Sequence, residues 1–167
     1  MTGVQTCALP IYEAEDLSKL VGGVAESWTV SPDGKTFTFK IRPNLKFQSG
    51  GPLTAEDVEF SLQRVVLMDK TSAFLLTQLG WSKTTVKDLV KGSDDTLVLK
   101  ITADFAPSLV LNLMTSIVAS VVEKKVALAN ESNGDLGNGW LKTHSASSGA
   151  YKLLAWKVEA EAAEPGK

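Results

Sequence analysis

The side-chain types that carry out most enzyme chemistry are scarce in this sequence of 167 residues. His144 is the only histidine, which excludes a zinc site built from several histidines. The adjacent carboxylates Glu56 and Asp57 face different directions on a helix and are therefore poor acid–base partners. No G-x-S-x-G turn presents a serine nucleophile. We expect a protein that is not an enzyme, with no catalytic residue, no metal ligand and no cofactor.

Aromatic side chains are the remaining candidates for contact with a small molecule. Trp140 follows a glycine and precedes a lysine-containing loop, so its ring has two interpretations: it stacks on a ligand or on the chain itself. Trp81 either lines a pocket or caps the core. His144, in the run KTHSASS, is interpreted as a solvated loop histidine rather than a metal ligand.

Composition is that of an ordinary globular domain, with 44% hydrophobic residues, 22% charged residues and a net charge of −2. Lysines and acidic residues are interspersed, so no basic stripe marks a face for nucleic acid, and none is expected as a partner. The most apolar run, Pro107–Val122, is too short and too often interrupted by polar residues to span a membrane. The length indicates one domain or a large piece of one.

The first eleven residues, MTGVQTCALPI, are uncharged, but polar residues interrupt any apolar core that a secretory signal would need. The string is similar to the translation of a common short-read sequencing adapter. We interpret residues 1–11 as an artefact and exclude them from functional reasoning, with an ordinary N-terminal strand as the alternative. Cys7 lies in this stretch, so residues 12–167 hold no cysteine and no disulfide framework.

The elements that would position any site begin with two hairpins. Val24–Phe47 contains the turn Ser31–Lys35, in which Pro and Gly supply the turn conformation. Apolar residues then alternate along Thr36–Ile41, which predicts a strand with one buried and one wet face. Val86–Ile101 predicts a second hairpin with an acidic turn.

A helix is predicted to follow Thr54, which is a good N-cap residue, with Asp57 completing a capping box. Apolar residues recur at helical spacing as far as Met68. Shorter elements are expected after it: a helical turn in Thr71–Trp81, a helix in Ala106–Met114 with Pro107 in its first turn, a helix end or buried strand in Ser116–Val122, a helix in Glu123–Glu131, a loop in Ser132–Gly139 and a strand in Ser147–Trp156.

Three phrases occur in order and at characteristic spacing: VAESWTVSPDGKTFTFKIRPNLKF (Val24–Phe47), GGPLTAEDVEFSLQRV (Gly50–Val65) and SSGAYKLLAW (Ser147–Trp156). Together they resemble the bacterial extracellular solute-binding proteins of family 5, the peptide, dipeptide and nickel-type binding proteins of ABC importers. Two loops depart from the family pattern. The family's HDG is QSG here (Gln48–Gly50), and its GTGP is SSGA (Ser147–Ala150).

The resemblance implies a mixed α/β (α+β) fold of hairpins and packed helices. It would be part of the first lobe of a bilobal, type II periplasmic-binding-protein-like fold, which closes on its ligand by hinge motion. Residues 12–156 would form that partial lobe and residues 157–167 a truncated tail. Because family members are several times longer, we interpret the chain as an internal piece of a longer protein.

The function implied is that of a substrate-binding component of an ABC importer, located in the periplasm or outside the cell, with a lipoprotein anchor as an alternative. Its partners would be a peptide or similar small solute and the permease subunits. The resemblance places Phe74 near the ligand cleft, although core packing is the favoured interpretation. Phe74, Trp81 and Trp140 are thus the candidate ligand-binding residues. The alternative function is a ligand-sensing domain of a transcription regulator.

Overall fold

The computed structural model describes residues 8–13, 19–151 and 153–154. The strands are β1 (Ile11–Glu13), β2 (Leu20–Gly22), β3 (Ala25–Val30), β4 (Thr36–Ile41), β5 (Val90–Ser93) and β6 (Thr96–Lys100). The helices are α1 (Ala55–Met68), α2 (Phe74–Thr77), α3 (Val86–Leu89), α4 (Pro107–Leu113), α5 (Lys124–Ala129) and α6 (Asn138–Leu141), with the 3₁₀ turns η1 (Thr71–Ala73) and η2 (Ile117–Ala119).

The main sheet is antiparallel, with the strand order β3-β4-β6-β5, and a separate pair is formed by β1 and β2. Both predicted hairpins are present in it as β3–β4 and β5–β6. Alternation along the two central strands buries one face, including Phe37 and Phe39 of β4 and Leu97 and Leu99 of β6. The other face stays partly or fully exposed, so the sheet covers the core from one side only.

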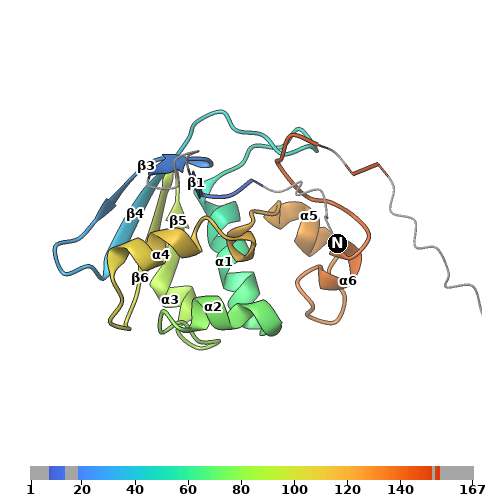
Figure 1. The fold of residues 1–167 in the computed structure, drawn as a ribbon. Helices are drawn as coiled ribbons and strands as arrows, with labels where there is room; N and C mark the ends of the chain where they lie inside the picture. The colour runs from blue at the N-terminus through green and yellow to red at the C-terminus, as the bar shows by residue number, and fades with distance from the viewer. Residues whose placement is uncertain (1–7, 14–18, 152, 155–167) are drawn as a thin grey trace, which may run out of the picture.

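Helix α1 is the central element between the sheet and the C-terminal helices (Figure 1). Its apolar residues Val58, Leu62 and Val66 are buried in the core that the sheet covers. Its first turn lies directly against β5, because a Cβ on Gly92 would be 2.3 Å from the carbonyl oxygen of Ala55. Only glycine permits so close an approach of the two backbones.

The predicted capping box of α1 is confirmed, since the Asp57 carboxylate accepts hydrogen bonds from the backbone N–H and the hydroxyl of Thr54, at 3.0 and 2.9 Å. The helical turn in Thr71–Trp81 is confirmed as η1 and α2, and the helix in Glu123–Glu131 as α5. Pro107 is the first residue of α4, as predicted. Neither alternative offered for Ser116–Val122, a helix end or a buried strand, is present: α4 ends at Leu113, and Ile117–Ala119 form the separate 3₁₀ turn η2.

Two expectations about extended structure were wrong in part. The N-terminal quarter of the predicted hairpin Val86–Ile101 is helical (α3), and the strand begins only at Val90. The strand expected at Ser147–Trp156 is not formed by those of its residues that the structure describes. Tyr151 and Leu154 there are 67% and 88% exposed, so these two side chains do not pack into the core as the side chains of a half-buried strand would.

The described part of the adapter-like stretch, Ala8–Ile11, packs against the rest of the chain. Ile11 is fully buried, and the carbonyl oxygen of Leu9 accepts a hydrogen bond from the N–H of Val24 at 3.0 Å. Residues 1–7 and 157–167 lie outside the described residues. The artefact interpretation concerns where the sequence came from, and it stays a prediction.

Candidate functional site

The three candidate ligand-binding residues lie in three different environments. Trp81 is buried, 1% exposed, and its Nε1–H donates to the carbonyl oxygen of Lys100 in β6 at 2.7 Å. Phe74 begins α2 with 58% of its surface exposed. Trp140 lies on α6 and is half-buried. The structure therefore does not gather them into one pocket, and only Phe74 and Trp140 have ring surface open to a solute.

The Trp140 ring is stacked on the His144 ring, with 4.5 Å between ring centroids and 10° between ring planes. His144 is itself exposed, and its Nδ1 lies 3.1 Å from the carbonyl oxygen of Trp140, one helical turn earlier. Of the two interpretations offered for Trp140, stacking on the chain is the one present in this structure. Contact with a solute stays a prediction for Trp140, as it does for Phe74 and Trp81.

The loop before α6 holds Trp140 in place through one carboxylate. Asp135 accepts hydrogen bonds from the backbone N–H groups of Ser132, Gly137 and Gly139 at 3.0, 3.0 and 2.7 Å. The bond from Ser132 and then that from Gly139 do most to hold the pKa of Asp135 below its ordinary value of 3.8, and the charge of Arg64 adds to them. The loop is thus organised around an ionised side chain.

Arg64 anchors this loop to α1. Its Nε–H donates to the carbonyl oxygen of Leu136 at 2.8 Å, and the side chain is partly buried. Burial lowers the pKa of Arg64, and the nearby Asp135 carboxylate opposes that shift. Leu136 itself has a positive φ of 51°, so the backbone turns sharply at the point that Arg64 holds.

Acid should loosen the loop that Asp135 organises. Because folding lowers the pKa of this carboxyl, its stabilising contribution is complete above the ordinary value of 3.8 and is lost as pH falls through the lower folded-state value. We expect the amide resonances of Gly137 and Gly139 to shift in that acid range in an NMR titration. Asp135→Asn should abolish the shift. A titration of these amides centred well above pH 4 would contradict this account.

The two loops that depart from the family pattern lie against each other. Ser147 Oγ donates to Gln48 Oε1 at 3.0 Å, and the Gln48 backbone N–H donates to the carbonyl oxygen of Ser147 at 2.9 Å. Gln48 Nε2 also donates to the carbonyl oxygens of Gly149, at 2.9 Å, and of Tyr151. Sequence reasoning treated the loops separately, because nothing in their spacing shows that residues about a hundred positions apart meet.

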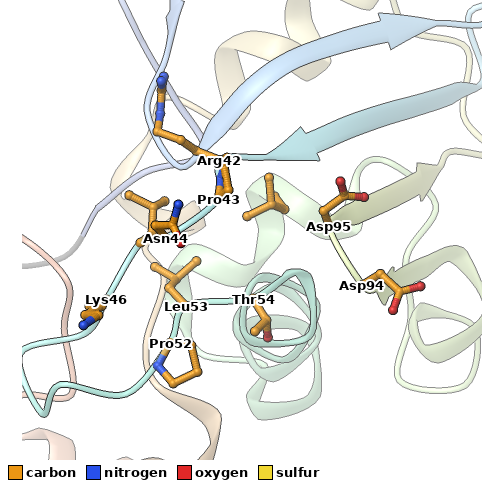
Figure 2. A pocket seen from close by; sticks show the side chains of 11 residues that line it. Arg42, Pro43, Asn44, Lys46, Pro52, Leu53, Thr54, Asp94 and Asp95 are labelled. Carbon is orange, nitrogen blue, oxygen red and sulfur yellow. The ribbon is translucent and has the colours of Figure 1, made fainter.

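An open pocket of about 310 Å³ lies between the end of β4 and the turn that joins β5 to β6 (Figure 2). The charged groups of Arg42, Lys46, Asp94 and Asp95 stand at its rim and point away from its middle. The pocket is lined by Ile41, Arg42, Pro43, Asn44, Leu45, Lys46, Pro52, Leu53, Thr54, Asp94 and Asp95. None of the three candidate residues belongs to this lining.

Two further classes of site are absent from the described residues. No group of three or more His, Cys, Asp or Glu side chains is arranged to hold a metal ion in this part of the chain. Among the same residues, no helix has both the length and the apolarity that crossing a bilayer requires. The geometry is that of a scaffold with exposed aromatic rings.

Comparison with known proteins agrees with this picture. The family profile described as bacterial extracellular solute-binding proteins, family 5 Middle, matches residues 19–163. The probable D,D-dipeptide-binding periplasmic protein DdpA of Escherichia coli (strain K12) is 31% identical over 138 residues, which covers 81% of this chain and 24% of DdpA. The dipeptide-binding protein DppE of Bacillus subtilis (strain 168) is 31% identical over 147 residues, 80% of this chain and 25% of DppE.

Solved structures show the same fold. Haemophilus influenzae OppA in complex with RPPGFSPFR superposes with a TM-score of 0.67 at 26% identity, covering 92% of this chain and 31% of OppA. NikZ from Campylobacter jejuni in complex with Ni(L-His) gives a TM-score of 0.71 at 17% identity, covering 91% of this chain and 28% of NikZ. The mixed α/β fold class is confirmed, and the named relatives are binding proteins rather than enzymes, as expected.

The chain spans about a quarter of the length of the curated relatives that it matches. The profile match covers most of the chain and contains the helices α1 to α6 and the sheet β3-β4-β6-β5 of the described residues. By this match the chain belongs to the bacterial extracellular solute-binding proteins of family 5.

Proposed function

We propose that this chain is part of the receptor of an ABC importer, which captures a peptide or similar small solute and delivers it to the permease. The observation that carries the proposal is the family 5 profile over residues 19–163. Relatives named for dipeptides and oligopeptides, and a 26% identical structure that holds a nonapeptide, favour a peptide as the solute. A receptor of this kind works in the periplasm or outside the cell.

Within such a receptor the exposed ring of Phe74 and the half-buried ring of Trp140 are the candidates of this chain best suited to contact the solute. An exposed aromatic ring offers a large apolar face at a small cost in conformational entropy. Trp81 has no ring surface left to offer, because its ring is buried and its N–H is satisfied by β6. Residues 12–156 would supply one wall of the binding cleft, and the remainder of the receptor the other.

The 167-residue chain alone should not bind peptides measurably, since one wall of a cleft cannot exclude water from a bound solute. Isothermal titration of the chain with RPPGFSPFR should give no heat above that of dilution. The complete receptor should bind it, and Trp140→Ala should weaken that binding about tenfold, the loss of roughly 1.4 kcal/mol. Val21→Ala, which shortens an exposed side chain on β2, serves as the control.

Micromolar binding by the 167-residue chain would contradict the division of the site between two parts of the receptor. A complete receptor that binds neither RPPGFSPFR nor shorter peptides would contradict the peptide assignment itself.

A further inference from the structure

Helix α1 carries a line of polar residues whose role the fold alone does not explain. Asp57, Ser61 and Arg64 follow one another at positions i, i+4 and i+7, which places them on one face of the helix. Asp57 and Ser61 are only 7% and 3% exposed, and Arg64 is partly buried. Buried polar groups of this kind need hydrogen-bond partners, and the identity of those partners indicates what the face does.

All three side chains reach the backbone of one segment, Val122–Leu136. The N–H of Lys124 donates to Asp57 Oδ1 at 3.0 Å. Ser61 Oγ accepts from the N–H of Val122 at 3.0 Å and lies 3.3 Å from its carbonyl oxygen. The third contact is the bond of 2.8 Å from Arg64 Nε to the carbonyl oxygen of Leu136.

These contacts fix both ends of the segment that leads to Trp140. Asp57 and Ser61 hold its start, where Lys124 is the first residue of α5. Arg64 holds its end at Leu136, two residues before α6 begins. In Figure 1, α5 and α6 lie on the side of α1 away from the sheet, as this arrangement requires. Helix α6 is only four residues long and has no fully buried residue, so it depends on the loop before it, which Asp135 organises and Arg64 ties to α1.

We propose that Asp57, Ser61 and Arg64 are positioning residues for solute binding: they fix the backbone of Val122–Leu136 against α1 and thereby place the Trp140 ring at the solute. This inference rests on the proposed function, since it assigns Trp140 to the solute site. The hydrogen bonds themselves are properties of this chain and can be tested without a solute.

A second polar pair on α1 provides a matched control. Glu59 and Gln63 face β5 instead: Glu59 Oε2 accepts from the N–H of Gly92 at 3.0 Å, and Gln63 Nε2 donates to the carbonyl oxygen of Val90 at 2.9 Å. Gln63→Ala therefore removes side-chain hydrogen bonds from the same helix without touching Val122–Leu136.

The first experiment is amide hydrogen exchange on the 167-residue chain. Arg64→Met should speed exchange of the Gly137 and Gly139 amides about tenfold relative to global unfolding, the effect of losing one hydrogen bond to a charged group. Arg64→Lys, whose ammonium can reach the same carbonyl, should restore part of the protection. Ser61→Ala should speed exchange of the Val122 amide, and Gln63→Ala should speed exchange only of amides in β5.

Unchanged exchange at Gly137 and Gly139 in Arg64→Met would overturn the proposal, whatever the variant does to global stability. If Gln63→Ala speeds exchange at these two amides as much as Arg64→Met does, the effect is general loosening of α1, and the proposal is likewise overturned.

The second experiment is a double-mutant cycle in the complete receptor, with RPPGFSPFR as the probe. If Arg64 acts through Trp140, Arg64→Met should weaken binding about tenfold, yet add nothing when Trp140 is already alanine. Fully additive losses would overturn the positioning role. A Trp140→Ala receptor that binds as tightly as the wild type would overturn it too, whereas a wild-type receptor that binds no peptide would contradict the proposed function instead.

Discussion

Replacing Trp81 with alanine should lower the free energy of unfolding by about 3–5 kcal/mol. The indole is 1% exposed, so its removal leaves a cavity in the core, and the carbonyl oxygen of Lys100 loses the N–H that it accepts at 2.7 Å. Because domains are stable by only about 5–15 kcal/mol, this loss approaches the whole stability of a small one. Urea denaturation followed by circular dichroism would measure it.

Phe74→Ala is the matched control for this change. The phenyl ring is 58% exposed, and truncating it should cost about 0.5 kcal/mol, as for surface positions in general. If instead Trp81→Ala is tolerated and Phe74→Ala unfolds the chain, the buried and exposed rings have been assigned the wrong way round, and Trp81 returns as a candidate for solute contact.

The second large effect is expected at Asp57, where alanine should lower the free energy of unfolding by about 3 kcal/mol. Asp57 Oδ2 accepts a hydrogen bond from the N–H of Thr54 at the start of α1, and Asp57 Oδ1 accepts one from the N–H of Lys124 at the start of α5. Loss of the Asp57 half of the capping box costs about 1 kcal/mol, and a part-buried N–H at Lys124 left without its partner costs about 1–3 kcal/mol more. Thermal unfolding of the variant and the parent chain would measure the sum.

Glu56→Ala is the control for Asp57, because Glu56 is the neighbouring acid in the same helical turn. Its carboxylate forms an exposed ion pair of 3.4 Å with Lys124 Nζ, an interaction worth less than about 1 kcal/mol. Equal destabilisation by Glu56→Ala and Asp57→Ala would mean that the charge near the helix start matters and the hydrogen bonds of Asp57 do not.

The sequence predicted those elements that depend on residues close together in the chain, such as helix caps and tight turns. The capping residues Thr54 and Asp57 predict the start of α1, and the proline and glycine in Ser31–Lys35 predict the turn of the first hairpin. In contrast, the pairing of β4 with β6, which makes two hairpins into one sheet, joins residues about sixty positions apart. Alternation is the same in every strand and does not say which strands are neighbours.

The candidate site was less predictable than the fold. Tryptophan is apolar enough for a core and polar enough for a surface, so Trp81 and Trp140 could not be separated by residue type. Trp81 bonds to Lys100 in β6, nineteen positions further along the chain, whereas Trp140 stacks on His144, which lies just beyond the end of α6. The sequence does contain one signal for the polar face of α1. The spacing of Asp57, Ser61 and Arg64 places three polar residues on one face of the predicted helix.

The polar face of α1 allows the sequence of Val122–Leu136 to vary during evolution. Its hydrogen bonds to Val122, Lys124 and Leu136 all end on main-chain atoms, which every amino acid supplies, apart from the N–H that proline lacks. The residues between these points can therefore be exchanged for others without removing a single one of the attachments. In a duplicated gene, substitutions within Val122–Leu136 can therefore alter the surface near Trp140 while Asp57, Ser61 and Arg64 keep the segment in place.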